Sequence, residues 1–328
     1  MKPYFILTAL LCLIMILFPF LAKTLQEKEK NTNIPETSST FTDKAESESE
    51  AASETVKVLR TASGNVIDMN LFDYLVGTIA GEMPASFCQE ALKSQAVVSY
   101  TYAKWILENS EGGESYISDS SSLHQKYIDE AEQKEKWQTD YEANRQRIED
   151  AVRSVYGKYL SFEGETAMTV FHALSSGKTL SAAQVWGKDI PYLKQVEAPG
   201  DNLSDKLESV ITFTGDEFRQ LFEEEGLIFE SDETEKWASV KEKSEEGYIR
   251  RLTICSVDFT ARQLRKILSL PSESFTAKTE NNSFIFTAYG RGHGVGMSQY
   301  SADYMARQGK SYKEILAHFY PGTVLEEK

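Results

Sequence analysis

Glu82 stands where a helical pattern meets a proline, in the segment GTIAGEMP (77–84). A carboxyl group at the C-terminal end of a helix lies against the negative end of the helix dipole, which disfavours its ionised form. Shielding by Met83 and by neighbouring aromatic rings would raise its pKa further. A carboxylic acid with a raised pKa can act as a general acid near neutral pH. Taken alone, however, the segment is more typical of an exposed glutamate at a helix end.

A second helix is predicted directly after this proline. Ser86 and Gln89 have the spacing of a capping box, and apolar residues follow at helical spacing as far as Trp105. Lys93 and Gln95 are polar positions close to the apolar face of this helix. They are candidates for contacting a ligand, although such positions more often belong to an ordinary surface.

The segment FHALSSGKT (171–179) combines a histidine with a turn of small residues. His172 stands near the end of a predicted strand, and Ser175 and Ser176 lie in the turn that follows. Their hydroxyl groups could hydrogen-bond a sugar or shape the turn. A lone histidine at such a position is more often structural.

Four glycines alternate with larger residues in AYGRGHGVGMSQY (288–300), between a predicted strand and a predicted helix. Glycine lets the backbone approach a ligand or another segment closely, here beside Arg291 and His293. The spacing is not the GxGxxG of dinucleotide-binding proteins, so we reject that interpretation. A tight structural loop with a buried histidine would show the same pattern.

Composition excludes several classes of protein. The 328 residues include 35 Lys and Arg against 50 Asp and Glu, so no basic surplus is present to bind a nucleic acid. Three cysteines are too few for a disulfide-rich scaffold or a four-cysteine zinc site. Cys88 and Cys255 could pair with each other, but we expect free, buried thiols. The length allows one large domain or two modest ones.

The N-terminus carries an uncharged stretch of 18 residues (5–22), flanked by Lys2 and Lys23. A membrane-spanning helix needs roughly 17–25 residues, whereas the apolar region of a cleaved signal peptide is shorter. We therefore expect an uncleaved single-pass anchor over residues 1–23. The rest of the chain would lie on the extracytoplasmic side of the cell membrane, and residues 24–55, which are acidic and nearly free of aromatic residues, would form a disordered tether.

Helical and strand patterns are mixed from residue 56 to residue 328 without a regular βαβ alternation, which predicts an α+β fold with mainly antiparallel strands. Asn70 and Ser311 are the predicted N-caps of the first and last helices. The predicted helices are 71–83, 87–110, 129–156, 216–225, 259–270, 298–307 and 312–319. The predicted strands are 159–162, 167–174, 211–213, 248–257 and 284–289. The charged helix 129–156 is expected to lie on the surface.

The order of these segments resembles the stage II sporulation protein D family, also called the SpoIID/LytB domain family. The resemblance spans residues 56–320 and is carried by LFDYLVGTIAGEMP, EALKSQAVVSYTYA, FHALSSGKT…VWGKDIPYLKQV and GRGHGVGMSQYSA, in this order. It implies a lytic transglycosylase that cuts peptidoglycan strands from which the stem peptides have been removed. Its partners would be a sporulation amidase and a third membrane protein of the engulfment complex. No cofactor is implied.

The family's catalytic glutamate falls on Glu82. The resemblance also implies a glycan-binding groove within the α+β domain, for which the candidate contacts are Lys93, Gln95, His172, Ser175, Ser176, Arg291, His293 and Gln299. Two departures from the family pattern matter. Tyr100 stands where an arginine is usual, and no cysteine accompanies His172 to bind the zinc found in some members, so we expect no metal.

Two other functions are compatible with the sequence. The chain could be a non-catalytic, glycan-binding activator of a partner amidase, in which case Glu82 would be dispensable. It could also be a purely structural, membrane-tethered scaffold, which would leave Glu82 and the glycine-rich loop without a purpose.

Overall fold

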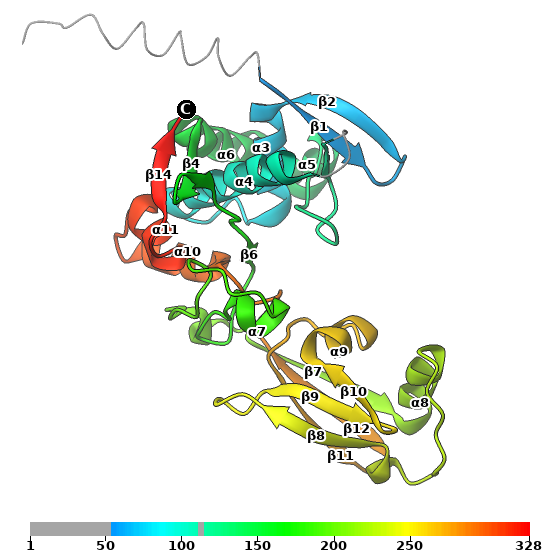
Figure 1. Cartoon of the computed structure of the whole chain (residues 1–328). Coiled ribbons are helices and arrows are strands. Elements are labelled where there is room, and N and C mark those ends of the chain that lie inside the picture. Colours follow the sequence, from blue (N-terminus) through cyan, green and yellow to red (C-terminus); the bar gives the residue numbers. More distant parts are fainter. Residues whose placement is uncertain (1–53, 111–114) are drawn as a thin grey trace, which may run out of the picture. The chain divides into compact units, whose positions relative to one another are not determined.

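The computed structural model describes residues 54–110 and 115–328 (Figure 1). The predicted anchor and nearly all of the predicted tether lie outside the described residues. Within the described part of the chain, no helix combines the length and the apolar character needed to cross a membrane.

The predicted α+β class is confirmed, and most strand pairs are antiparallel. The parallel pairs are β1 with β3 and β6 with β13. The described helices are α3 (Leu71–Glu82), α4 (Gln89–Asn109), α5 (Glu130–Trp137), α6 (Tyr141–Val155), α7 (Ala182–Trp186), α8 (Gly215–Glu224), α9 (Ala261–Ile267), α10 (Gln299–Arg307) and α11 (Tyr312–Phe319). The described strands are β1 (Thr55–Arg60), β2 (Asn65–Asn70), β3 (Ile117–Ser118), β4 (Lys158–Phe162), β5 (Glu165–Thr166), β6 (Phe171–His172), β7 (Glu208–Thr214), β8 (Ala238–Lys243), β9 (Ile249–Ile254), β10 (Val257–Thr260), β11 (Phe275–Glu280), β12 (Ser283–Tyr289), β13 (Met297–Ser298) and β14 (Val324–Glu327).

One hydrophobic core is built mainly by α3, α4, α6, α10 and α11 (Figure 1). Tyr74, Leu92, Ile148 and Tyr320 are among its fully buried side chains. The short sheet β14–β4–β5 adds to this core and pairs the C-terminal end of the chain with β4. The core therefore joins the first and last thirds of the described sequence.

A second core lies within residues 208–289. The sheets β11–β12–β7 and β10–β9–β8, with α8 and α9, enclose a cluster of aromatic rings in which Phe218 stacks on Phe284 at a centroid distance of 3.8 Å. The two ends of this segment are adjacent, because the Gly290 N–H donates to the Leu207 carbonyl oxygen at 2.7 Å. The segment is therefore an insertion between the third and fourth motifs.

Several local predictions are wrong. Helix α4 begins at Gln89 with Cys88 as its N-cap, so the capping box predicted at Ser86 does not form. The predicted helix 129–156 is broken into α5 and α6 at Gln138, which adopts a positive φ of 47°. Helix α6 also buries Ile148 and its neighbours against α3 and α4, so it is not a purely solvated helix.

Candidate functional site

Glu82 is the last residue of α3 and is half-buried. Its Oε1 accepts a hydrogen bond from the backbone N–H of Lys126 at 2.5 Å. Burial raises the pKa of Glu82, and the Lys126 N–H and the cationic side chains of Lys126 and Lys136 oppose the rise without cancelling it. The Lys136 ammonium group also donates to the Ala80 carbonyl oxygen at 2.7 Å, which fixes its charge beside the end of α3.

Two glycines of α3 allow the segment that carries Lys126 to lie directly on the helix. A Cβ at Gly77 would overlap the Tyr127 ring, and a Cβ at Gly81 would lie 2.7 Å from the Lys126 carbonyl oxygen. Since the two glycines are four residues apart, they lie on one face of α3. The close approach brings the Lys126 N–H to the carboxyl group of Glu82.

Gln125 anchors the same segment from inside the core. It is fully buried, and its Nε2 donates to the Tyr74 hydroxyl oxygen at 3.2 Å and to the Ser99 carbonyl oxygen at 3.1 Å. The Tyr74 ring stacks on Tyr127, with centroids 6.0 Å apart. Gln125 thus holds the backbone next to the Lys126 donor, a role that its sequence context did not indicate.

The third and fourth motifs meet along their backbones. The N–H of Arg291 donates to the Leu174 carbonyl oxygen at 2.7 Å, and the Leu180 N–H donates to the Gly294 carbonyl oxygen at 2.6 Å. At Gly296 the backbone has a φ of +73°, and a Cβ there would collide with the Val170 carbonyl oxygen. The alternating glycines therefore serve close packing of two chain segments, as one of the two interpretations of this loop predicted.

His172 and His293 lie at this junction with ring centroids 5.9 Å apart. Burial lowers the pKa of His172 to about 4 and that of His293 to about 3. His172 shares a hydrogen bond of 3.1 Å with the Val295 carbonyl oxygen, and its Nε2 is buried without a partner. Both imidazoles are therefore neutral at pH 7, and His172 is buried.

Asp201, which sequence reasoning missed, ties the two motifs together. It is fully buried and accepts hydrogen bonds from the Ser175 N–H and hydroxyl at 2.7 Å each. The Ser298 and Ser301 hydroxyls both donate to it at 2.8 Å. Burial raises the pKa of Asp201, and these four bonds oppose the rise. Ser175 thus has a structural partner, which leaves Ser176 as the serine of this turn that reaches a surface pocket.

The other four predicted contacts occupy different surroundings. Gln95 is fully buried, donates to the Ser99 hydroxyl oxygen at 3.0 Å and accepts from the Gln299 amide at 3.2 Å, so both glutamines join α4 to α10 instead of facing solvent. Lys93 is paired at 2.7 Å with Glu90. Arg291 is exposed. Tyr100, at the position of the expected arginine, is buried in the first core.

The predicted site residues do not form a single cluster. Glu82 belongs to the end of α3, whereas His172, Ser175, Ser176, Arg291 and His293 belong to the junction of the third and fourth motifs. In the described ranges, no hydrogen bond or ion pair joins Glu82 to that junction. In the same ranges, Cys88 and Cys255 are free thiols, but they are half-buried instead of buried as expected. His, Cys, Asp and Glu nowhere gather in threes in these ranges to hold a metal ion.

Comparison with known proteins identifies the family. A family model described as stage II sporulation protein matches residues 60–162, which contain Glu82 and its surroundings. The whole chain is 32% identical to stage II sporulation protein D of Bacillus subtilis (strain 168) and covers 96% of that relative. This chain belongs to the stage II sporulation protein D family. The resemblance inferred from the four motifs is thereby confirmed.

The chain is also similar to other proteins. Stage II sporulation protein D of Bacillus amyloliquefaciens is 32% identical to the whole chain and is covered to 96%. A protein called amidase enhancer, from Bacillus subtilis (strain 168), is 25% identical over 76% of the chain and 40% of its own length. The matched family model ends before the third and fourth motifs.

Glu273, a second acid that sequence reasoning missed, lies beside the histidine junction of this family member. It is 4% exposed, lines a small hollow together with His293, and approaches Arg265 at 3.8 Å. Burial raises its pKa to about 7, although Arg265, Arg262 and Arg250 act in the opposite direction. Because this pKa is raised, Glu273 contributes stability that is fully present below about pH 4.5 and is lost as pH rises through 7.

We expect Glu273→Gln to remove this alkaline loss of stability. Between pH 5 and pH 8 the free energy of unfolding of the unmodified protein should fall by about 2–3 kcal/mol relative to the variant. Chemical unfolding at a series of pH values measures this difference. His172 and His293 act with the opposite sign, since their lowered pKa values cost stability below about pH 6.5 in both proteins. Parallel curves for the two proteins from pH 5 to pH 8 would contradict the prediction.

Proposed function

We propose that this protein is a peptidoglycan lytic transglycosylase. It cleaves denuded glycan strands at the bond between N-acetylmuramic acid and N-acetylglucosamine, and it acts during engulfment in sporulation. The observation that carries the proposal is Glu82, a half-buried carboxyl group with a raised pKa at the end of α3. Membership in the stage II sporulation protein D family supports the sporulation role.

The surroundings of Glu82 assign different tasks to its two oxygens. Because Oε1 accepts the Lys126 N–H, the acidic proton resides on Oε2. Protonated Glu82 donates this proton to the glycosidic oxygen as the bond from that oxygen to C1 breaks. The Lys126 N–H and the nearby Lys136 charge then stabilise the carboxylate that remains.

The same carboxylate completes the reaction as a base. It takes the proton from the C6 hydroxyl of the muramic acid residue, whose oxygen attacks C1 and closes a 1,6-anhydro ring. Glu82 is protonated again at the end, and no water is consumed. A single carboxyl group suffices, whereas most glycoside hydrolases use a pair.

The location and partners of the protein belong to the same proposal. A membrane anchor over residues 1–23 would hold the catalytic domain on the extracytoplasmic side, next to its polymeric substrate. A sporulation amidase that removes stem peptides would supply the denuded strands, and a third membrane protein would complete the assembly.

The alternative function is activation of a partner amidase without glycan cleavage. It is favoured by the relative called amidase enhancer, which is similar to 76% of the chain. The two functions differ in their need for Glu82, because activation through glycan binding does not require an acid there.

Product analysis separates these functions. The full-length chain in detergent is incubated with peptide-free glycan strands in water enriched in ¹⁸O, and the products are identified by mass spectrometry. We expect unlabelled 1,6-anhydro ends, since the new bond uses the substrate's own C6 oxygen. Labelled reducing ends would show hydrolysis and overturn the proposed chemistry. Stimulation of an amidase without any glycan products would favour the alternative.

A further inference from the structure

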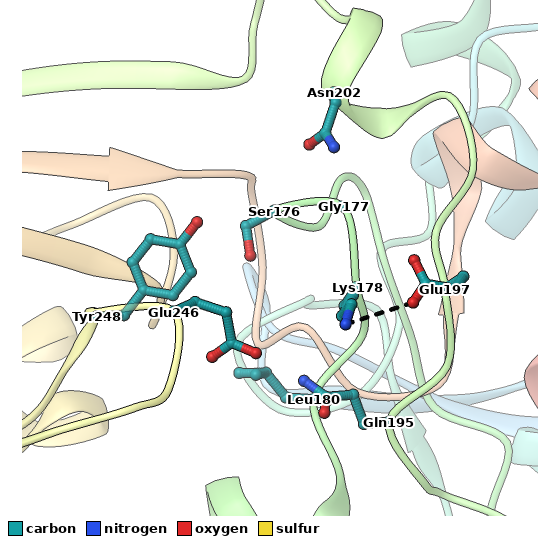
Figure 2. Close-up of a pocket in the computed structure, with 9 residues that line it drawn as sticks. All are labelled: Ser176, Gly177, Lys178, Leu180, Gln195, Glu197, Asn202, Glu246 and Tyr248. Atoms are coloured by element: carbon teal, nitrogen blue, oxygen red, sulfur yellow. Dashed lines mark ion pairs between the residues drawn. The ribbon is translucent and has the colours of Figure 1, made fainter.

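A surface pocket of about 150 Å³ adjoins the turn of the third motif (Figure 2). The side chains of Tyr248 and Glu246 lie on one side of it, and those of Gln195 and Glu197 lie on the other. Neither Glu82 nor Lys126 lines this pocket. The pocket is therefore separate from the Glu82 site.

The turn that forms one wall of the pocket is anchored by a close backbone contact and by a buried hydrogen-bond network. Gly177 has a φ of +93°, and the Asn202 amide lies within 3.0 Å of the place where its Cβ would be. The neighbouring residues Ser175 and Asp201 are joined by two hydrogen bonds of 2.7 Å. The lining residues Ser176 and Asn202 are thus each adjacent in sequence to a residue of this buried Ser175–Asp201 pair. The pocket is therefore formed in the absence of a ligand.

The charges of the pocket are already satisfied within the protein. Lys178 is paired with Glu197 at 3.4 Å, so its charge is partly balanced within the pocket. The carboxylate of Glu246 accepts hydrogen bonds from the backbone N–H of Glu246 itself and from the Ser244 hydroxyl. These bonds hold the pKa of Glu246 below its usual range. A ligand with a strong charge of either sign would have to displace one of these partners.

The remaining groups suit a neutral ligand rich in hydroxyl and amide groups. Gln195 and Asn202 are exposed and offer both donors and acceptors. The half-exposed Tyr248 offers a ring face, and its hydroxyl shares a hydrogen bond with Ser176. An adjoining hollow shares Ser176 and Lys178 with this pocket and extends to His293, which gives an extended ligand a second place to lie.

We propose that this pocket is an accessory subsite for a neutral N-acetylated saccharide, which holds a glycan strand at a distance from the reacting bond. The assignment of the substrate class rests on the proposed function. The subsite itself does no chemistry, so its contribution is to affinity. Strands long enough to reach both sites bind more tightly than short ones, because the second contact becomes intramolecular.

Saccharide binding tests the proposal. The fluorescently labelled tetramer of β-1,4-linked N-acetylglucosamine is titrated against the full-length chain carrying Glu82→Gln, which prevents turnover. We expect the additional substitutions Gln195→Ala and Asn202→Ala to raise Kd by about tenfold, the effect of losing one or two hydrogen bonds. Both side chains are exposed, so folding should be kept. Gln308→Ala, an exposed amide beyond the end of α10, is the matched control and should leave Kd unchanged.

The outcomes distinguish this proposal from the proposed function. An unchanged Kd in the double variant would overturn the subsite, whatever reaction the protein catalyses. Binding of a lysine-containing peptide is measured with the same variants. If the double substitution weakens peptide binding but leaves saccharide binding unchanged, the pocket binds a peptide and the proposed saccharide subsite is overturned. If the double variant binds the saccharide more weakly but the unmodified protein forms no anhydro products, the subsite is supported and only the proposed transglycosylase activity is refuted.

Discussion

Glu82→Gln is expected to lower the rate of glycan cleavage by about 10²–10⁴-fold, the usual contribution of a general acid or base. Glutamine keeps an oxygen that can accept the Lys126 N–H, so the local backbone should stay in place. It cannot release a proton to the glycosidic oxygen or take one from the C6 hydroxyl. The measurement is the rate at which 1,6-anhydro ends appear at saturating substrate.

A matched control tests whether the effect is specific to position 82. Glu223→Gln removes the same charge from an exposed position on α8 in the second core, and it should cleave at the unmodified rate. Saccharide binding by both variants should equal that of the unmodified protein, since Glu82 is assigned to chemistry. A Glu82→Gln protein that still cleaves within a few-fold of the unmodified rate would move the acid to another residue.

Among the variants considered, Asp201→Ala should cause the largest loss in the free energy of unfolding, about 3–5 kcal/mol. The substitution leaves the Ser175 N–H and the hydroxyls of Ser175 and Ser298 without their acceptor in the interior, whereas the Ser301 hydroxyl keeps the Pro199 carbonyl oxygen. Each unsatisfied buried group costs about 1–3 kcal/mol unless water or rotation rescues it. The third and fourth motifs should lose their common anchor. Chemical unfolding, with hydrogen exchange at the Ser175 amide as a local readout, measures the effect.

Two further variants make the Asp201 result specific. Asp201→Asn retains one acceptor oxygen, and serine hydroxyls can rotate to accept from its amide, so its loss should be smaller than that of alanine. Asp205→Ala removes a carboxylate from an exposed position four residues away and should change the unfolding free energy by less than about 0.5 kcal/mol. Equal losses at positions 201 and 205 would show that the buried network contributes little.

The sequence predicted those elements whose signals are local. Asn70 and Ser311 are the N-caps that their side-chain types indicated, with bonds to the Asp73 and Glu314 amides. The helix break at Gln138 depends on a positive φ that glutamine rarely adopts, so its residue type gave no signal. The predicted strand 167–174 shrinks to β6 because its carbonyl groups bond to the glycine-rich loop and to Tyr320 instead of a long sheet partner.

The candidate site was predictable only in part for the same reason. Glu82 stands in a recognisable motif, and the glycine-rich loop has a distinctive spacing. Gln125, Asp201 and Glu273 lie in ordinary loop sequence, and their roles come from partners far along the chain. Asp201, for example, is about 100 residues from Ser301. Burial and long-range contact, which decide what these side chains do, leave no mark in local composition.

The pairing of β14 with β4 has a consequence for biosynthesis. Residues 324–327 complete a three-stranded sheet by pairing with residues 158–162, and Tyr320 is fully buried in the same core. During vectorial synthesis the first core therefore stays incomplete until residues 320–327 have emerged, whereas residues 208–289 contain all the strands of their own sheets and can fold earlier. A chain truncated before β14 would carry Glu82 on an unfinished scaffold.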